Sequence, residues 1–301
     1  MFVVLGASGN TGSVVTKKLL EKGEKVRVVG RDAGRLEPLT RLGAEPFVSD
    51  VTESAALTKA FAGAKGAYLL VPPRLKDADM LAASDRMSSA MSEAVRNAGV
   101  SHVVLLSSVG AQHDAKTGPI LGLHWFENKL RQVPNLNAVF LRPAFFMENF
   151  FMLIGLIQSM GFLAGGIKAD LKMPMIATRD IGAAAAETLL DGTFSGIAVR
   201  ELHGQRDISH DEAAAALGSA IGKPKLSYQR FPSFMVQSAM KQMGLPGKTA
   251  ALMAELNEAA NDGLLDPTQP RSAATTTPTS IEAFAQEVFA PAYNAKAAAG
   301  A

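Results

Sequence analysis

The segment that most constrains the fold is a turn with a glycine at every third position, Gly6-Ala7-Ser8-Gly9-Asn10-Thr11-Gly12. It lies between the apolar run Phe2–Leu5 and a helical pattern over Thr11–Lys22. Glycines at such a turn let a ligand approach the main chain at a helix N-terminus, where unpaired N–H groups favour an anion. The spacing is Gly-x-x-Gly-x-x-Gly, and ordinary tight turns also contain glycines. Its place after the first strand predicts a dinucleotide-binding turn, with contacts from Gly6, Ser8, Gly9, Asn10, Thr11 and Gly12.

Short apolar runs alternate with helical stretches over about the first 141 residues. The runs are mostly β-branched or Leu-rich, as in strands that are covered on both faces. They are Phe2–Leu5, Lys25–Val29, Glu45–Val48, Gly66–Val71, His102–Leu106 and Asn137–Leu141. Apolar residues at helical spacing mark Thr11–Lys22 and Asp85–Ala98. The alternation predicts an α/β fold, a doubly wound parallel sheet of the Rossmann type.

The alternation loosens after about residue 150. A strand pattern over Lys172–Ala177 precedes an alanine-rich helix that starts at Asp180, and Ser209–Glu212 is typical of a capping box. Helices dominate the remainder. We therefore expect an NAD(P)-binding domain over residues 1–150 and a smaller, mainly helical substrate-binding lobe over residues 151–301. Whether the chain crosses between the lobes stays open, and Lys172–Ile181 is the segment that could return to the main sheet.

Composition excludes several classes of function. The chain has 301 residues, 48% of them hydrophobic, and its 30 Lys and Arg against 28 Asp and Glu are scattered, so we expect no nucleic-acid partner. It has no cysteine, and its five histidines form no His-x-x-x-His pair, so we predict no metal site. The apolar run near Phe150–Ile157 is far shorter than the roughly 18 residues of a membrane span. Without a signal-peptide pattern at Met1, we expect a cytoplasmic protein.

Charged residues after the second and third strands bear on the cofactor. Gly30-Arg31-Asp32 follows the second strand, where an acidic side chain would hold a ribose hydroxyl and an arginine would favour a 2′-phosphate. Because arginine comes first and Arg35 lies one turn further on, we favour NADP(H) over NAD(H). A solvated surface role for Arg31 stays open. Asp50 could contact the adenine, or it could cap the helix that starts near Glu53.

An ordered set of motifs resembles the NmrA-like proteins, which are atypical short-chain dehydrogenases/reductases. The motifs are the glycine turn, Gly-Arg-Asp at 30–32, Ser-Asp-Val-Thr at 49–52, Leu-Leu-Val-Pro-Pro at 69–73, Leu-Leu-Ser-Ser at 105–108 and Leu-Arg-Pro-Ala-Phe-Phe-Met-Glu-Asn at 141–149. The likeness continues through 177–182 to about residue 289. It implies NADP(H) along the strand ends, with Val71 and Pro72 beneath the nicotinamide ribose, and a substrate cleft between the lobes. The family includes NAD(P)H-dependent quinone reductases and regulators that bind the dinucleotide without turnover.

The superfamily's catalytic serine and Tyr-x-x-x-Lys set is only partly matched. The serine corresponds to Ser107 or Ser108, but the helix has His124 and Asn128 in place of the tyrosine and lysine. His124 and Asn128 share a helix face, whereas Lys129 is turned by roughly 140° from His124. The resemblance thus implies Ser107, Ser108 and His124 as catalytic candidates, with Ser107 and Asn128 also at the cofactor. A histidine that only packs or caps remains an alternative to an acid with a pKa near neutrality.

An aromatic segment follows the sixth strand, where a substrate would meet the nicotinamide. It contains Phe145, Phe146, Phe150 and Phe151, with Asn149 as a polar member. Phe145, Phe146 and Asn149 are candidate contacts for a flat, apolar substrate, although core or subunit packing is the commoner role of such an aromatic stripe.

Three hypotheses of function follow. The first is an NADP(H)-dependent oxidoreductase, monomeric or homodimeric, that reduces a quinone or a similar electron-poor carbonyl compound, since hydride transfer to such a ring needs little acid from the protein. The alternative is a non-catalytic NADP(H)-binding regulator that acts through a protein partner. A nucleotide-sugar epimerase ranks last, because it would need the missing tyrosine and lysine.

Overall fold

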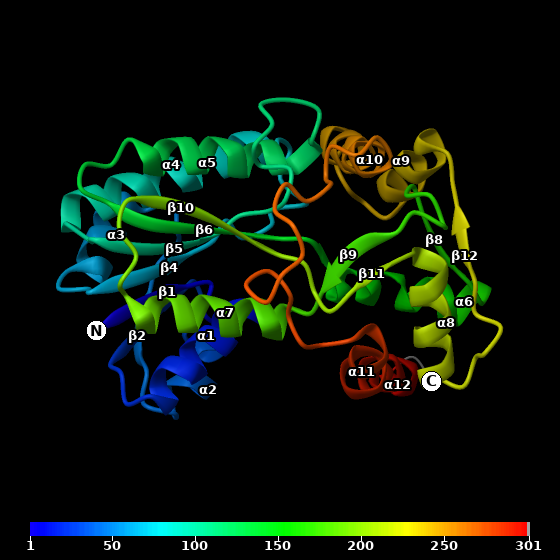
Figure 1. The fold of residues 1–301 in the computed structure, drawn as a ribbon, viewed down its shortest axis with the longest axis horizontal. Coiled ribbons are helices and arrows are strands. Elements are labelled where there is room, and N and C mark those ends of the chain that lie inside the picture. Colours follow the sequence, from blue (N-terminus) through cyan, green and yellow to red (C-terminus); the bar gives the residue numbers. More distant parts are fainter. Residues whose placement is uncertain (300–301) are drawn as a thin grey trace.

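The computed structural model describes residues 1–299 of the chain. The last two residues of the lobe expected over 151–301 lie outside the described residues. Figure 1 shows two lobes joined side by side, one built on an extended sheet with helices on both faces and the other mainly helical. Among the described residues, no helix combines the length and apolar character needed to cross a bilayer.

The larger lobe contains a seven-stranded sheet in the order β10-β6-β5-β4-β1-β2-β3, and every pair of neighbours is parallel. The strands are β1 (Phe2–Leu5), β2 (Val26–Gly30), β3 (Glu45–Val48), β4 (Gly66–Leu69), β5 (His102–Leu106), β6 (Asn137–Pro143) and β10 (Ile197–Leu202). This confirms the predicted fold class, with the six predicted strands near their expected positions. The sequence pattern missed β10, an edge strand whose first residues are only partly buried and which includes Arg200 and Glu201.

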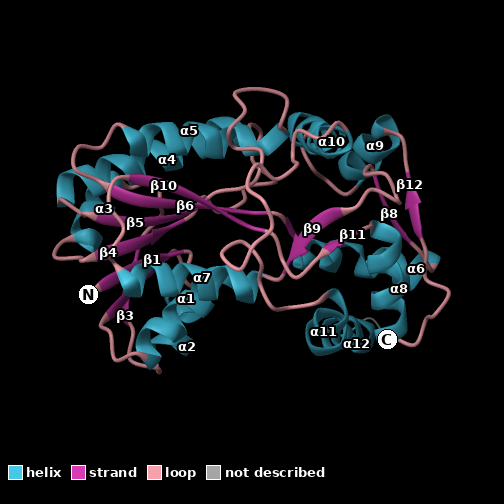
Figure 2. Ribbon diagram, viewed as in Figure 1, coloured by secondary structure: helices cyan, strands magenta, loops and turns pink. Residues whose placement is uncertain are grey.

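Helices cover both faces of this sheet (Figure 2). They are α1 (Asn10–Glu21), α2 (Ala33–Thr40), α3 (Ser54–Phe61), α4 (Met80–Ala98), α5 (Leu121–Arg131) and α7 (Thr178–Asp191). Buried side chains from α3, α4 and α5 form one core with the sheet, and those from α1, α2 and α7 form a second core. Burial on both faces explains why these strands are apolar in succession.

Helix α4 is longer than its apolar spacing predicts. Its start is fixed by Asp79, whose carboxylate accepts a hydrogen bond from the amide of Ala82, so the helix begins at Met80 and not at Asp85. It ends at Gly99, which adopts a left-handed conformation with φ +68°. Both ends therefore follow the usual chemistry of an acidic N-cap and a glycine C-cap.

The smaller lobe combines helices with two small sheets. Its strands are β7 (Phe145–Phe146), β8 (Leu163–Gly165), β9 (Met173–Ile176), β11 (Asp207–Ile208) and β12 (Tyr228–Arg230), and its helices are α6 (Ile154–Met160), α8 (His210–Ala220), α9 (Ser233–Gln242), α10 (Gly247–Asn261), α11 (Ile281–Phe284) and α12 (Ala290–Ala299). The short helices η1 (Gly118–Ile120), η2 (Met147–Leu153) and η3 (Ala285–Phe289) complete the list. The predicted capping box at Ser209 and Glu212 is present and opens α8.

The chain returns from the smaller lobe to the larger one through α7, whose first residues lie within the segment Lys172–Ile181. Within Lys172–Ile181, β9 pairs with β7 and β11 in a separate sheet and not with the main one. The return is made by α7, which packs on α1, and by β10. A Cβ atom on Gly182 would lie 2.6 Å from the Cβ of Val14, so glycine permits this close helix contact. A strand pattern alone does not reveal which sheet a strand joins, because that depends on distant partners.

Candidate cofactor and substrate site

The glycine turn after β1 has a geometry that glycine alone fits. Gly6 has φ +59°, and a Cβ atom on Gly12 would lie 2.4 Å from the carbonyl oxygen of Gly6. Gly9 is the N-cap of α1, and no side chain caps that helix end. Gly9 and Asn10 are exposed and Ser8 is half-buried. The first-turn amides of α1 therefore face a position that an anionic group can occupy without displacing a capping side chain.

Thr11 belongs to the interior of the turn. It is buried, and its hydroxyl accepts a hydrogen bond of 2.9 Å from the hydroxyl of Tyr68 on β4. Burial raises the pKa of Tyr68 strongly, against the hydrogen bond with Thr11, so this phenol stays protonated. The side chain of Thr11 thus joins α1 to the sheet, and a cofactor contact from this residue would be made by its main chain.

The two charged residues after β2 have different surroundings. Arg31 is exposed, with 62% of its side chain accessible, and its guanidinium lies 4.0 Å from the carboxylate of Asp50. Asp32 is the N-cap of α2: its carboxylate accepts hydrogen bonds from the amides of Gly34 at 2.8 Å and Arg35 at 3.4 Å. The acidic side chain at the strand end is therefore engaged by the next helix, whereas the arginine remains accessible.

Asp50 lies at the centre of a small charged network after β3. It accepts hydrogen bonds from the amide and hydroxyl of Thr52, both at 3.0 Å, and from one nitrogen of Arg74 at 3.0 and 2.7 Å. Partial burial acts to raise the pKa of Asp50, but the hydrogen bonds from Thr52 and Arg74 outweigh it and lower the pKa. The capping alternative for Asp50 is wrong, because Glu53 precedes α3. Arg74, the first basic residue after the fourth strand, was not among the predicted site residues.

Ser107, at the end of β5, is buried in a second charged network. Its hydroxyl donates a 2.6 Å hydrogen bond to Glu127 on α5. The guanidinium of Arg142 donates two more to the same carboxylate, at 2.9 and 2.6 Å. Glu127 was absent from the predicted site, although it lies one turn beyond His124. The neighbouring Ser108 is half-buried.

His124 and Asn128 do share a face of α5, as their spacing predicts. The Nδ1 atom of His124 lies 2.9 Å from the carbonyl oxygen of Ala111, and its Nε2 atom lies 2.9 Å from the amide nitrogen of Asn128. Since a carbonyl only accepts, Nδ1 carries the hydrogen and Nε2 accepts from the amide. Both ring nitrogens of His124 are therefore engaged in internal hydrogen bonds.

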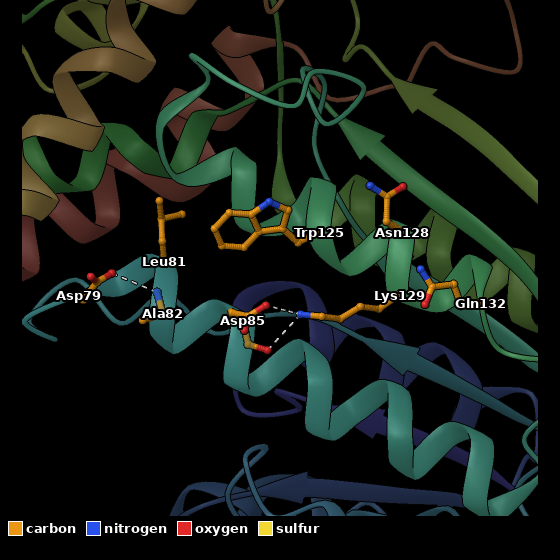
Figure 3. Close-up of a pocket in the computed structure, with 8 residues that line it drawn as sticks. All are labelled: Asp79, Leu81, Ala82, Asp85, Trp125, Asn128, Lys129 and Gln132. Atoms are coloured by element: carbon orange, nitrogen blue, oxygen red, sulfur yellow. Dashed lines mark hydrogen bonds and ion pairs between the residues drawn. The ribbon is translucent and has the colours of Figure 1, made fainter.

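Asn128 also faces an open groove of about 670 Å³ between α4 and α5. Figure 3 shows Trp125 and Lys129 beside this groove, with Asp85 on the facing helix. The amine of Lys129 donates to the carboxylate of Asp85 at 2.5 Å and to the hydroxyl of Ser88 at 2.8 Å. Lys129 is thus engaged between the two helices and does not replace the missing lysine at the strand ends.

The aromatic segment after β6 divides between the two lobes. Phe145 packs in the smaller lobe, where its ring centroid lies 5.6 Å from that of Phe150 and 5.4 Å from that of His210. Phe146 packs against the core that α1, α2 and α7 form with the main sheet. Both are partly buried, as are Asn149, Val71 and Pro72. Their direct contact with a substrate or cofactor stays a prediction.

Glu148, in the same segment, links the lobes. Its carboxylate accepts from the amide and hydroxyl of Thr178, at the start of α7. Burial raises the pKa of Glu148, and the bonds from Thr178 only partly oppose this. Asp180 in the first turn of α7 in turn accepts from the amide and hydroxyl of Thr279. These contacts fix the first turn of α7 to segments from both ends of the smaller lobe.

The arrangement defines a Rossmann-type α/β protein with a second lobe beyond the carboxyl ends of its strands. The model of the NmrA-like family matches residues 1–285, so the chain belongs to that family. An NAD(P)H azoreductase from Xenophilus azovorans is 28% identical over 258 residues, 85% of this chain and 86% of that protein.

Two solved structures share the fold. An NADPH-dependent quinone oxidoreductase from Escherichia coli, in complex with NADPH, matches with a TM-score of 0.82 and 22% identity over 96% of this chain and 100% of that one. A triphenylmethane reductase from Citrobacter sp., in complex with NADP(H), matches with a TM-score of 0.81 and 20% identity over 95% and 99%.

Proposed function

We propose that this protein is an NADP(H)-dependent oxidoreductase that reduces a quinone or a similarly electron-poor acceptor. The observation that carries the proposal is the uncapped turn between β1 and α1, where the Cβ of any other residue at Gly12 would collide with the backbone at 2.4 Å. A turn so tightly folded against an accessible helix N-terminus fits a pyrophosphate. The azoreductase and quinone oxidoreductase relatives support the reductase class.

The residues around the turn fit the rest of the dinucleotide. Ser8, Gly9 and Asn10 would bind the pyrophosphate, and Arg31, whose side chain is 62% accessible, would bind a 2′-phosphate through its planar guanidinium. Val71 and Pro72 follow β4, next to β1 in the sheet, where they would support the nicotinamide ribose. When bound, the reduced cofactor supplies the hydride, and the protein supplies binding and orientation.

The polar groups beside β5 and α5 are better suited to orientation than to proton donation. The hydroxyl hydrogen of Ser107 is directed at Glu127, and the ring hydrogen of His124 is directed at Ala111. Neither group is free to donate a proton without breaking an internal hydrogen bond. The reaction that fits this arrangement delivers a hydride to an acceptor whose product takes its proton from water, as a quinone can. Alcohol oxidation, which needs a strong base at the hydroxyl, fits poorly.

The test follows NADPH oxidation by absorbance with a panel of quinones and one azo dye. Quinone-dependent turnover is expected, together with loss of turnover and of NADPH binding in Gly9→Val, because a side chain would enter the pyrophosphate position. His124→Ala is expected to retain activity within about ten-fold, since loss of general acid catalysis would lower it by 10²–10⁴. Turnover by Gly9→Val at the wild-type rate would refute the cofactor site.

Arg31→Ala tests the finer choice of cofactor. Removal of the guanidinium should weaken NADPH binding by at least ten-fold and NADH binding little, because only NADPH carries the 2′-phosphate. Isothermal calorimetry with each dinucleotide measures both. An equal loss for NADPH and NADH would remove the assignment of Arg31 to the phosphate.

A second candidate is a regulator that binds NADP(H) without turnover and acts through a protein partner. The observation that favours it is the engagement of both Ser107 and His124 in internal hydrogen bonds. Tight NADPH binding with no turnover on any acceptor of the panel would favour this second candidate over the reductase.

A further inference from the structure

Two carboxylates flank Arg31, the residue proposed above to bind the 2′-phosphate. Asp32 is the next residue, and Asp50 lies 4.0 Å from the guanidinium. An acidic residue after β2 ordinarily selects the 2′-hydroxyl of NAD(H), because its negative charge repels a 2′-phosphate. A phosphate bound to Arg31 would lie well within the Debye length of about 8 Å from Asp50, so salt would not screen the repulsion.

The negative charge of Asp32 is already compensated within the protein. Its carboxylate points to the N-terminus of α2, where it accepts from two main-chain amides at 2.8 and 3.4 Å. Those amides and the positive end of the helix offset its charge. Asp50 has no helix end available, because α3 begins four residues later with Glu53 as its N-cap.

Arg74 supplies the missing compensation for Asp50. One guanidinium nitrogen lies 3.0 and 2.7 Å from the two oxygens of the Asp50 carboxylate, closer than Arg31 at 4.0 Å. Only 24% of the Arg74 side chain and 27% of the Asp50 side chain are accessible, so this pair is less hydrated than Arg31. A partly buried pair interacts more strongly than an exposed one.

Arg74 and Asp50 come from loops that follow strands far apart in the sheet. Arg74 follows β4, whereas Asp50 follows β3, and β1 and β2 lie between those strands in the sheet. The ion pair therefore joins loops from both sides of the two strands whose carboxyl ends carry the glycine turn and Arg31. Asp50 is thus paired with Arg74, while the side chain of Arg31 is 62% accessible.

We propose that Arg74 is a specificity-determining residue: it neutralises Asp50 so that Arg31 can accept the 2′-phosphate of NADP(H). This inference rests on the proposed cofactor site. Arg74 itself acts through Asp50 and not on the reacting atoms.

The test measures dissociation constants by calorimetry for 2′,5′-ADP and 5′-AMP, which share the adenosine and differ in the 2′-phosphate. The expected result for Arg74→Met is a loss of affinity for 2′,5′-ADP of about ten-fold, with 5′-AMP changed less than three-fold. Without its partner arginine, the Asp50 carboxylate would repel the 2′-phosphate, which 5′-AMP lacks. The double variant Asp50→Asn, Arg74→Met should recover the wild-type preference. Arg41→Met, which removes an exposed arginine paired with Glu37, is the control and should change neither constant.

The outcomes separate the inference from the proposed function. Equal loss of both ligands in Arg74→Met, or no recovery in the double variant, would mean that Arg74 only holds its loop, and would overturn the inference alone. Binding of neither ligand by the wild-type protein would overturn the proposed function as well. Equal wild-type affinity for the two ligands would overturn the NADP(H) preference and, with it, the role of Arg74. Thermal unfolding of each variant checks that the fold is retained.

Discussion

Replacing Glu127 with alanine should be among the most destabilising single changes in the larger lobe. The Glu127 side chain is 3% accessible and the Arg142 side chain 8%, and the two are joined by hydrogen bonds of 2.9 and 2.6 Å. The change would leave the Arg142 guanidinium buried with only its 3.3 Å contact to Gln112, and the Ser107 hydroxyl without its acceptor. Breaking a buried pair by removing one partner costs about 3–5 kcal/mol, so we expect a loss of about 4 kcal/mol.

Glu37→Ala provides the matched control. Glu37 on α2 pairs at 2.5 Å with Arg41, the C-cap residue of that helix. The two side chains are 57% and 75% accessible, so removal of Glu37 should cost less than about 0.5 kcal/mol. Urea unfolding followed by circular dichroism measures both losses. The double variant Glu127→Leu, Arg142→Met should regain at least half of the stability lost in Glu127→Ala, since an apolar pair leaves no buried charge. A loss in Glu127→Ala within about 1 kcal/mol of that in Glu37→Ala would refute the reasoning, because solvent or rearrangement would then have solvated Arg142.

The remaining predictions concern the glycine turn and a buried histidine. Gly12→Ala should reduce the free energy of unfolding by about 1–3 kcal/mol and weaken NADPH binding, since its Cβ would lie 2.4 Å from the Gly6 oxygen. Gly155→Ala in α6, where the nearest contact of a Cβ would be at 3.7 Å, is the control and should stabilise by up to about 1 kcal/mol. Similar changes in the free energy of unfolding for the two variants would contradict this reasoning. His210 is packed among Phe145, Phe150 and Tyr228, and burial lowers its pKa from 6.5 to about 4. The unfolded chain therefore binds its proton more tightly, so this residue's stability contribution is complete above pH 6.5 and falls by about 2 kcal/mol by pH 5. His210→Phe should remove that part of the pH dependence in denaturant unfolding between pH 7 and 5, and an unchanged slope would show that His210 is not the group involved.

The site was predictable where the signal lies in adjacent residues. The spacing of Gly6, Gly9 and Gly12 located the turn, because a strand, a turn and a helix that follow one another in sequence must meet in space. His124 and Asn128 were correctly placed on one face, since helix geometry fixes residues four apart. Asp50 was singled out by its position after a strand, but its partner Arg74 was not, because the two are brought together only when β3 and β4 take their places in the sheet.

The sequence by itself determined the α/β class, six of the seven main strands and the family to which the chain belongs. These properties follow from local periodicity and short motifs, which depend on residues within a few positions of each other. The tertiary structure decided how the charged and polar side chains are used: Asp32 caps α2, Arg74 engages Asp50, and Glu127 holds both Ser107 and Arg142. It also decided that β10 completes the main sheet while β9 does not. Such choices depend on which distant segments become neighbours, and burial then makes each pairing strong enough to determine the role of the side chain.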